Sequence, residues 1–298
     1  MLRTATLLAL SALSLSAAAT CPGHGDATTM LVSTAWVSDH LNDPGLVLLS
    51  VGPKADYDKG HIAGAQYVDL ATISAKGVPL TLELPPMAEL QTTFRGLGVS
   101  NDSRIILYAT APLPQSTTRV FLTLDAMGLG RNVSLMDGGI PQWQSENRAV
   151  TTDVRAVKAG TVEPCGREDI ITDATFVNAN IRHDGVHIVD ARLNSYYTGE
   201  QIPPNQRAGH VPGAASIPYS SLVDSLGKLK PAAELGKIFT DAGVKKGERV
   251  VSYCHVGQQA TVVYFVARYL GYDARLYDGS WQDWSQRTDL PVQTGTKP

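Results

Sequence analysis

The stretch "SYCHVGQQATVV" (252–263) places a cysteine where an apolar run ends and a helical pattern begins. Cys254 is a candidate for three roles: a buried core thiol, one half of a disulfide, or a nucleophile. Gly257 permits a tight turn with positive φ, so the chain can pass from strand to helix within about six residues. The amides of 255–260 and the N-terminus of the next helix can then converge on the sulfur and lower the pKa of the thiol. This position favours the nucleophile over an inert core residue.

Two chemistries use a cysteine between a strand and a helix. Cleavage of phosphate esters needs an arginine at the end of the loop to hold the phosphoryl oxygens, but this chain has Ala260 there, followed by Thr261. Sulfur transfer needs a nucleophile, an anion-stabilising loop and some positive charge nearby. It requires neither a metal nor an organic cofactor, and the sequence has no CxxC or clustered His/Cys spacing typical of a metal site. Sulfur transfer is therefore the favoured chemistry.

One unit occurs twice in the chain. "GVSNDSRIILYA" (98–109) aligns with "GVKKGERVVSYC" (243–254), "HIAGA" from His61 with "HVPGA" from His210, and "DGGIPQW" (137–143) with "DGSWQDW" (278–284). The copies lie 141 to 149 residues apart, which is the size of a domain and too long for a solenoid repeat. We expect two similar globular domains that meet near "TTDVRAVKAGTVEPCG" (151–166), a stretch without a clear apolar period.

Each copy alternates short apolar runs with helical patterns, which indicates an α/β fold with a mostly parallel sheet flanked by helices. In the first copy the expected strands are 46–51, 104–109 and 132–139, and the expected helices are 87–98 and 117–128. In the second copy the expected strands are 186–190, 249–254 and 274–279, and the expected helices are 231–243 and 259–271. Such sheets bind ligands at the carboxyl ends of their strands, which is where Cys254 stands.

The first copy serves as an internal control for the second. Residues that occur in both copies are interpreted as loop, capping, packing or other structural residues: His61, His210, Trp143, Trp284, Arg104 and Arg249. We therefore do not assign the two histidines as general bases. Residues that occur in one copy are the better candidates for chemistry.

Three features distinguish the second copy. Cys254 aligns with Ala109, and Asp190 and Arg192 of "VDAR" align with Ser50 and Gly52. The loop after Cys254 is short, whereas its counterpart "TAPLPQST" (110–117) is longer and holds two prolines. The first copy therefore lacks both the candidate nucleophile and a counterpart of Arg192.

With these motifs the chain resembles the tandem rhodanese-type sulfurtransferases. The resemblance rests on "HIAGA" and "HVPGA", "VDAR", "YCHVGQQATVV" and the two DG-x4-W stretches, and it covers essentially all of the mature chain. It implies a rhodanese-like domain without the catalytic cysteine over 28–152 and a catalytic one over 165–296. It also implies that Cys254 forms the persulfide and that the next residues supply its hydrogen bonds, namely His255, Val256, Gly257, Gln258, Gln259 and Ala260.

The substrate-binding charges depart from this family pattern. The family's second arginine, four places after the arginine of "DAR", is replaced here by Tyr196. Arg192 is a candidate for substrate contact or for an ion pair with Asp190. Arg207 is a candidate for substrate contact or a solvated loop residue. His255 is expected to carry partial positive charge at neutral pH, since the ordinary pKa of histidine is about 6.5.

The sequence is compatible with three functions. Thiosulfate sulfurtransferase is favoured, with 3-mercaptopyruvate sulfurtransferase and a non-enzymatic persulfide carrier or redox module as the alternatives. The expected partners are a small sulfur donor (thiosulfate or mercaptopyruvate) and a thiophilic acceptor (cyanide or a thiol). A formal net charge of −3 gives no reason to expect nucleic acid or an anionic membrane surface. No apolar run after the N-terminus approaches the ~18 residues needed to span a bilayer. The oligomeric state is not predicted.

The N-terminus resembles a signal peptide over residues 1–20, because Arg3 precedes an apolar stretch that ends in "AAA" (17–19). We therefore expect an exported protein, periplasmic or secreted. Its three cysteines would lie in an oxidising compartment, where an odd number leaves at least one thiol unpaired. Cys21 and Cys165 are candidates for a disulfide. Cys21 is also considered for lipid attachment, although the preceding "AAT" departs from the usual lipoprotein signal.

Overall fold

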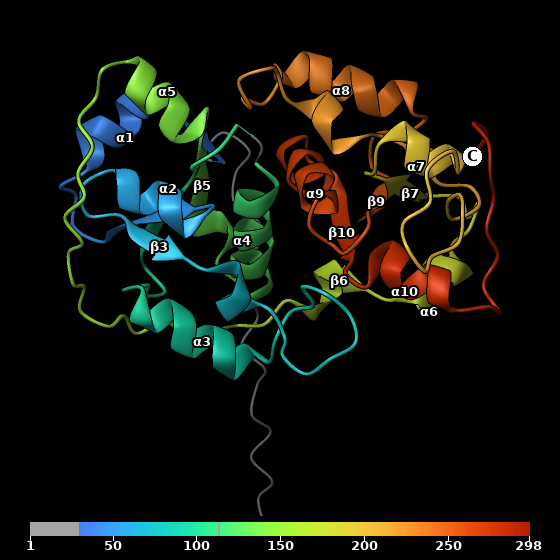
Figure 1. Cartoon of the computed structure of the whole chain (residues 1–298), viewed down its shortest axis with the longest axis horizontal. Coiled ribbons are helices and arrows are strands. Elements are labelled where there is room, and N and C mark those ends of the chain that lie inside the picture. The colour runs from blue at the N-terminus through green and yellow to red at the C-terminus, as the bar shows by residue number, and fades with distance from the viewer. Residues whose placement is uncertain (1–29, 113) are drawn as a thin grey trace, which may run out of the picture.

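The computed structural model describes residues 30–112 and 114–298, so the expected signal peptide and Cys21 lie outside the described residues. Two five-stranded sheets form the centres of two domains that lie side by side (Figure 1). The strand orders are β1-β5-β4-β2-β3 and β6-β10-β9-β7-β8, and the recorded pairs are parallel. The α/β fold with two similar domains is thereby confirmed.

The two domains use corresponding elements in the same chain order. The strands are β1 (Leu31–Val32), β2 (Leu46–Val51), β3 (Gln66–Val68), β4 (Arg104–Ala109), β5 (Val133–Met136), β6 (Ile171–Thr172), β7 (Val186–Asp190), β8 (Ala215–Ser216), β9 (Arg249–Tyr253) and β10 (Asp273–Tyr277). The helices are α1 (Thr34–His40), α2 (Lys54–Lys59), α3 (Met87–Gly96), α4 (Gln115–Ala126), α5 (Gly139–Ser145), α6 (Ala174–Ala179), α7 (Asn194–Thr198), α8 (Ala232–Asp241), α9 (Ala260–Tyr269) and α10 (Ser280–Gln286).

Helices cover both faces of each sheet, which explains why the central strands carry buried apolar residues on both faces. Alternate side chains of β4 enter different clusters: Ile105 and Leu107 pack with α3 and α4, whereas Ile106 and Tyr108 pack with α1 and α5. In the second domain, α8 and α9 cover one face of the sheet, and α6 and α10 cover the other.

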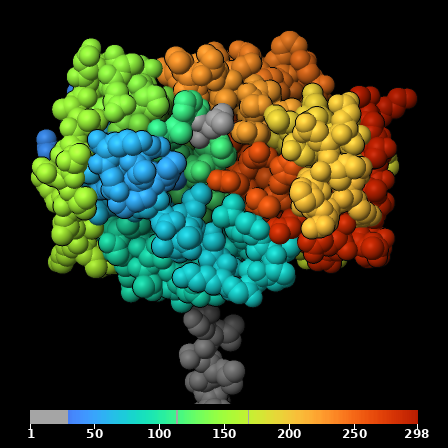
Figure 2. All heavy atoms as spheres, viewed as in Figure 1, coloured from blue at the N-terminus to red at the C-terminus, as the bar shows by residue number. Residues whose placement is uncertain are grey.

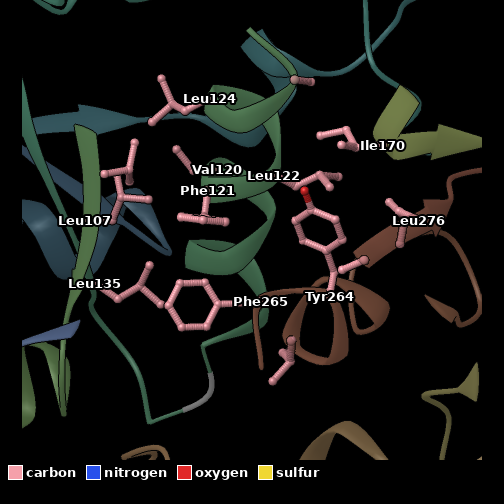
Figure 3. Packing of buried hydrophobic residues seen from close by; sticks show 14 of the residues in the cluster. Leu107, Val120, Phe121, Leu122, Leu124, Leu135, Ile170, Tyr264, Phe265 and Leu276 are labelled. Carbon is pink, nitrogen blue, oxygen red and sulfur yellow. The ribbon is translucent and has the colours of Figure 1, made fainter. Parts of the chain in front are cut away.

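A single hydrophobic cluster continues from the first domain into the second through α4 and α9. Phe121 of α4 meets Phe265 of α9 edge to face, with ring centroids 4.8 Å apart (Figure 3). Every residue of α4 from Thr117 to Ala126 is buried, because one side of the helix lies on the first sheet and another on α9. The two domains therefore share this cluster, and each has a further cluster of its own on the other face of its sheet.

Polar side chains join equivalent positions of α4 and α9. The hydroxyls of Thr118 and Thr261 are 2.7 Å apart. Asp125 forms a buried ion pair with Arg268 and also accepts a hydrogen bond from Tyr264. Each charged group is thus matched within the interface, as burial of charge requires.

The residues that recur in both copies are structural, as predicted. His61 stacks on Tyr57 and His210 on Tyr197, and each histidine Nδ1 bonds the carbonyl of that same tyrosine, near the end of α2 or α7. Trp143 and Trp284 are buried. Arg104 and Arg249 reach groups on or beside the neighbouring strand, Arg104 through Ser134 and Arg249 through Asp273.

Each domain also sends a loop across to the other. The segment 75–86 of the first domain reaches the second near β6 and α10 (Figures 1 and 2). The segment 224–229 of the second domain reaches the carboxyl end of the first sheet, where the Leu229 amide donates to Asp137 at 3.2 Å. Within the described residues, no helix has the length and apolar character to cross a membrane.

Candidate functional site

Cys254 directly follows β9, and α9 begins six residues later at Ala260. Its amide donates to the Ser280 hydroxyl at 3.1 Å, and its carbonyl accepts from the Trp281 amide at 2.9 Å. The start of α10 therefore fixes the backbone at the nucleophile. Cys254 is free, which removes the disulfide reading of this residue.

The Cys254 side chain is completely covered and belongs to the large hydrophobic cluster. A buried core thiol was one of the three candidate roles, and the structure places the side chain among apolar residues. The side chain points into the cluster that α9 and the sheet share, so access of a substrate requires the covering residues to move. Cys165, in contrast, is disulfide-bonded; its expected partner, Cys21, lies outside the described residues.

The loop after Cys254 keeps a set of unused amide donors. Across the described residues, the amides of 255–260 have no recorded hydrogen-bond acceptor. Gly257 turns the loop with φ +74°, and a Cβ there would lie 2.6 Å from Asp278 Oδ1. Unpaired amides on a short loop before a helix form an anion-binding nest, because each N–H presents a partial positive charge. The loop thus has unused donors of the kind that bind an anion.

Arg192 and Asp190 form a fully buried ion pair at the end of β7. The guanidinium also donates to the Gly209 carbonyl at 2.7 Å, while its Nη1 has no hydrogen-bond partner. Burial lowers the pKa of Arg192, but the adjacent Asp190 outweighs this and raises it above its usual range. Both readings of Arg192 are therefore compatible with the geometry: it pairs with Asp190 and still has one nitrogen unused.

His255 is neutral at physiological pH, which corrects the expectation of partial positive charge. Burial, and then the nearby charge of Arg192, lowers its pKa to about 4. Its ring packs edge to face on Tyr196, with centroids 4.6 Å apart. The residue that replaces the family's second arginine thus meets the loop as an aromatic contact rather than as a charge.

The other predicted loop residues face different neighbours. Gln258 donates through Nε2 to the Ser116 hydroxyl of the first domain at 3.0 Å. Gln259 has a buried Oε1 without a hydrogen-bond partner. Val256 is partly buried, and Ala260 is buried at the start of α9.

Arg207 lies outside this cluster of contacts. Its guanidinium donates to four backbone carbonyls, those of Trp284, Ser285, Arg287 and Leu290. Four of the five N–H donors of an arginine are thereby occupied. Arg207 is partly buried and holds the end of α10 and the chain after it in place.

Sequence reasoning missed one residue of the first domain that reaches the cysteine loop. Arg119 of α4 is 1% exposed, pairs with Asp278 and donates to the Gly257 carbonyl at 3.0 Å. The signal that could have revealed it is a charged residue inside an apolar helix, at a position where the second copy has Val262.

A large hollow of the described surface lies away from the cysteine loop. A cavity of about 890 Å³ separates the segment 75–87 from β6, α6 and β10, and it includes Asp278 but no residue of the loop 254–260. The equivalent strand end in the first domain, at Ala109, is filled: a space of only about 20 Å³ remains between Pro112, Pro114 and the incoming Gly227.

Comparison with known proteins agrees with this geometry. The family model described as "Rhodanese-like domain" matches residues 33–146 and again 173–287. The sulfur carrier protein TtuD of Thermus thermophilus is 32% identical over 89% of this chain and 97% of its own length. The 3-mercaptopyruvate sulfurtransferase of Escherichia coli is 29% identical over 89% of this chain and 98% of its own length.

A solved structure gives the same result at the level of the fold. The crystal structure of the 3-mercaptopyruvate sulfotransferase SseA from Escherichia coli superposes with a TM-score of 0.77 at 28% identity, covering 85% of this chain and 99% of that one. The chain therefore belongs to the rhodanese family and carries two rhodanese-like domains in tandem.

Proposed function

We propose that this rhodanese-type sulfurtransferase takes up sulfane sulfur at Cys254 as a persulfide and passes it to a thiophilic acceptor. The observation that carries the proposal is a free cysteine at a strand end, followed by a loop whose six amides have no acceptor among the described residues. The first domain has Ala109 at the equivalent position and its strand end is filled, so it contributes no second nucleophile.

With thiosulfate as donor, the Cys254 thiolate attacks the outer sulfur. A cysteine–sulfur bond forms, the sulfur–sulfur bond of thiosulfate breaks, and sulfite leaves with the electron pair. Cyanide then attacks the terminal sulfur of the persulfide, thiocyanate leaves, and the thiolate is restored. The loop amides stabilise the negative charge on sulfur in both half-reactions, and they need no reorganisation to do so.

The preferred donor is proposed from charge. Thiosulfate is a small dianion. The Nη1 of Arg192 has no hydrogen-bond partner, and the charge of Arg192 interacts with Cys254 and with His255, the first residue of the loop with the unused amides. His255 adds no charge at neutral pH. A thiosulfate sulfurtransferase of Pseudomonas aeruginosa is 26% identical over 89% of this chain. Mercaptopyruvate is the alternative, since relatives of similar identity are named for it; attack on its sulfur would release the enolate of pyruvate.

A persulfide carrier is a second candidate, favoured by one observation. The Cys254 side chain is fully covered, and a covered persulfide is protected from adventitious thiols until a partner reaches it. A relative named as a sulfur carrier protein is 32% identical to this chain. In this case uptake from the donor is retained, while turnover with small acceptors such as cyanide is slow.

We also propose that the protein is exported. The disulfide of Cys165 supports an oxidising compartment, because such bonds are rare where thiols are kept reduced. The boundaries of the expected signal peptide lie outside the described residues. N-terminal sequencing of the protein purified from its native compartment checks both cleavage and location.

The experiment that tests the proposed function is the intact mass of the purified protein before and after thiosulfate, and again after cyanide, with Cys254→Ser alongside. Gain of one sulfur atom, its loss as thiocyanate on cyanide addition, and no gain in the variant would establish the persulfide. Gain with mercaptopyruvate but not thiosulfate would assign the other donor. Sulfur that stays bound in cyanide but moves to a protein thiol would favour the carrier. No gain with either donor would refute the proposal.

A further inference from the structure

Arg119 is a buried arginine in the domain that lacks the nucleophile. It lies in α4 with 1% of its surface exposed. Its counterpart in α9 is Val262, because the facing pairs Thr118–Thr261 and Asp125–Arg268 both join positions 143 residues apart. Arg119 thus occurs in one copy only. Burying the charge of Arg119 is costly, although the equivalent position of α9 holds the apolar Val262.

The guanidinium of Arg119 joins four segments of the chain. It forms a two-nitrogen ion pair with Asp278, which follows β10, and donates to the Leu82 carbonyl. Its Nη1 also donates to the Gly257 carbonyl at 3.0 Å, inside the cysteine loop. Asp278 in turn accepts from the Leu84 amide at 3.0 Å. The first domain is therefore hydrogen-bonded directly to the loop that follows Cys254.

The hydrogen bond to Gly257 fixes the orientation of a peptide plane. In a trans peptide the C=O of one residue and the N–H of the next point in opposite directions. Because the Gly257 carbonyl faces Arg119, the Gln258 amide faces away from α4, and it has no acceptor among the described residues. A flip of this plane would turn the carbonyl oxygen to the side that now presents the amide. The loop would then offer a negative partial charge in place of a donor.

The ion pair between Arg119 and Asp278 also lies close in sequence to a residue that contacts the Cys254 backbone. Asp278 is followed two residues later by Ser280, whose hydroxyl accepts from the Cys254 amide at 3.1 Å. We infer that Arg119 is a positioning residue of the non-catalytic domain, which sets the Gly257–Gln258 peptide so that its amide stays available to sulfur at Cys254. This inference rests on the proposed function for its consequence in turnover. Arg119 acts through the loop and does not itself touch the sulfur donor.

The test compares two buried ion pairs of the same interface. Arg119→Met/Asp278→Asn removes the donor to Gly257 without leaving an unpaired buried charge, and the asparagine can still accept from Leu84. Arg268→Met/Asp125→Asn removes the other pair, which has no recorded contact with the cysteine loop. Arg119→Lys keeps the charge and serves as the conservative variant. Each protein is measured for its melting temperature, for kcat/KM with thiosulfate, and for the pH midpoint of Cys254 alkylation by iodoacetamide.

We expect both double variants to melt at similarly lowered temperatures. The Arg119 double variant should also lose about 10- to 100-fold in kcat/KM and show an alkylation midpoint raised by about one pH unit, with Arg119→Lys in between. The Arg268 double variant should keep both values. The pH midpoint of alkylation reports the ionisation of the Cys254 thiol. It does not depend on how often the residues that cover the thiol move aside.

Unchanged kcat/KM and midpoint in the Arg119 double variant would overturn the inference, and so would equal changes in both double variants. The alkylation midpoint decides this even where no donor reacts. Failure of wild-type protein to gain sulfur therefore counts against the proposed function, separately from the role of Arg119.

Discussion

The strand ends at Ala109 and Cys254 occupy the same place in two equivalent sheets, yet their surroundings are opposite. In the first domain, Pro112 and the incoming Gly227 leave about 20 Å³, room for about one water molecule. In the second, a short loop presents six amides without acceptors among the described residues, and the charge of Arg192, whose Nη1 is also unpartnered, interacts with His255 of this loop. The fold alone therefore does not make the site. The nucleophile, the loop that follows it and the nearby charge do.

The largest expected effect comes from moving the nucleophile between the two strand ends. Cys254→Ser should lower sulfur transfer by about 10⁴-fold or more, because the reaction has no other attacking atom. Adding Ala109→Cys to this variant should restore nothing, since segment 224–229 fills that strand end. Thiocyanate production from thiosulfate and cyanide measures both. Measurable rescue by Ala109→Cys would break the comparison.

The next effect distinguishes the turn at Gly257, in the cysteine loop, from the turn at Gly227, at the strand end of the first domain. Gly257→Ala places a Cβ 2.6 Å from Asp278 Oδ1 at a positive φ and should lower kcat/KM by about 100-fold, because the loop amides must shift. Gly227→Ala places a Cβ 1.6 Å from the Pro112 carbonyl oxygen, also at a positive φ, and should lower the melting temperature by a few degrees. Its kcat/KM should stay within about twofold. Kinetics and thermal unfolding of the two variants together check this, and an inactive, fully stable Gly227→Ala protein would contradict it.

Arg192→Lys tests the arginine at the end of β7, which has Gly52 as its counterpart in the first domain. Lysine keeps a cation beside Asp190 but lacks the fork of donors, so the unpartnered nitrogen is lost. We expect KM for thiosulfate to rise about tenfold with a smaller change in kcat. An unchanged KM would assign Arg192 to the ion pair alone. Steady-state kinetics over a range of thiosulfate concentrations give both constants.

The smallest effect concerns His255. Since its pKa is lowered to about 4, kcat/KM should show no ionisation of this ring between pH 5 and 8, and His255→Gln should change kcat/KM by no more than about threefold.

The same pKa predicts a dependence of stability on pH. The unfolded chain binds a proton near pH 6.5 and the folded chain only near pH 4, so the neutral ring contributes stability above pH 6.5 that is lost as the pH falls toward 4. His255→Gln should therefore lose less stability than wild type between pH 7 and pH 4.5. Urea unfolding at the two pH values measures this, and an equal loss in both proteins would refute the assignment.

Periodicity and the internal repeat were sufficient for the fold class and for the central elements, but not for the short strands β1, β3, β6 and β8 or the short helices. Central strands such as β4 and β9 are apolar on both faces and bounded by turns, so their positions follow from local pattern. The repeat also identified the paired histidines, arginines and tryptophans as structural residues, because the same residue types make equivalent contacts in both domains.

The site was predictable only where it depends on local sequence. The strand–loop–helix order around Cys254 and Gly257 could be read directly. The cover over the Cys254 thiol, the lowered pKa of His255 and the carbonyl contacts of Arg207 could not, because each depends on residues distant in the chain. The contact of Arg119 with the loop is equally non-local, since 138 positions separate Arg119 from Gly257.

The pairing of Asp125 with Arg268 has a consequence for how domains choose partners. These positions are equivalent, so two first domains that met through the same helix face would bring Asp125 against Asp125, and two second domains would bring Arg268 against Arg268. Like charges in such a contact cost several kcal/mol. The first domain is thus complementary to the second and repelled by another copy of itself. One reversal of charge lets a chain built from near-duplicates distinguish its two halves and directs association away from homotypic pairing.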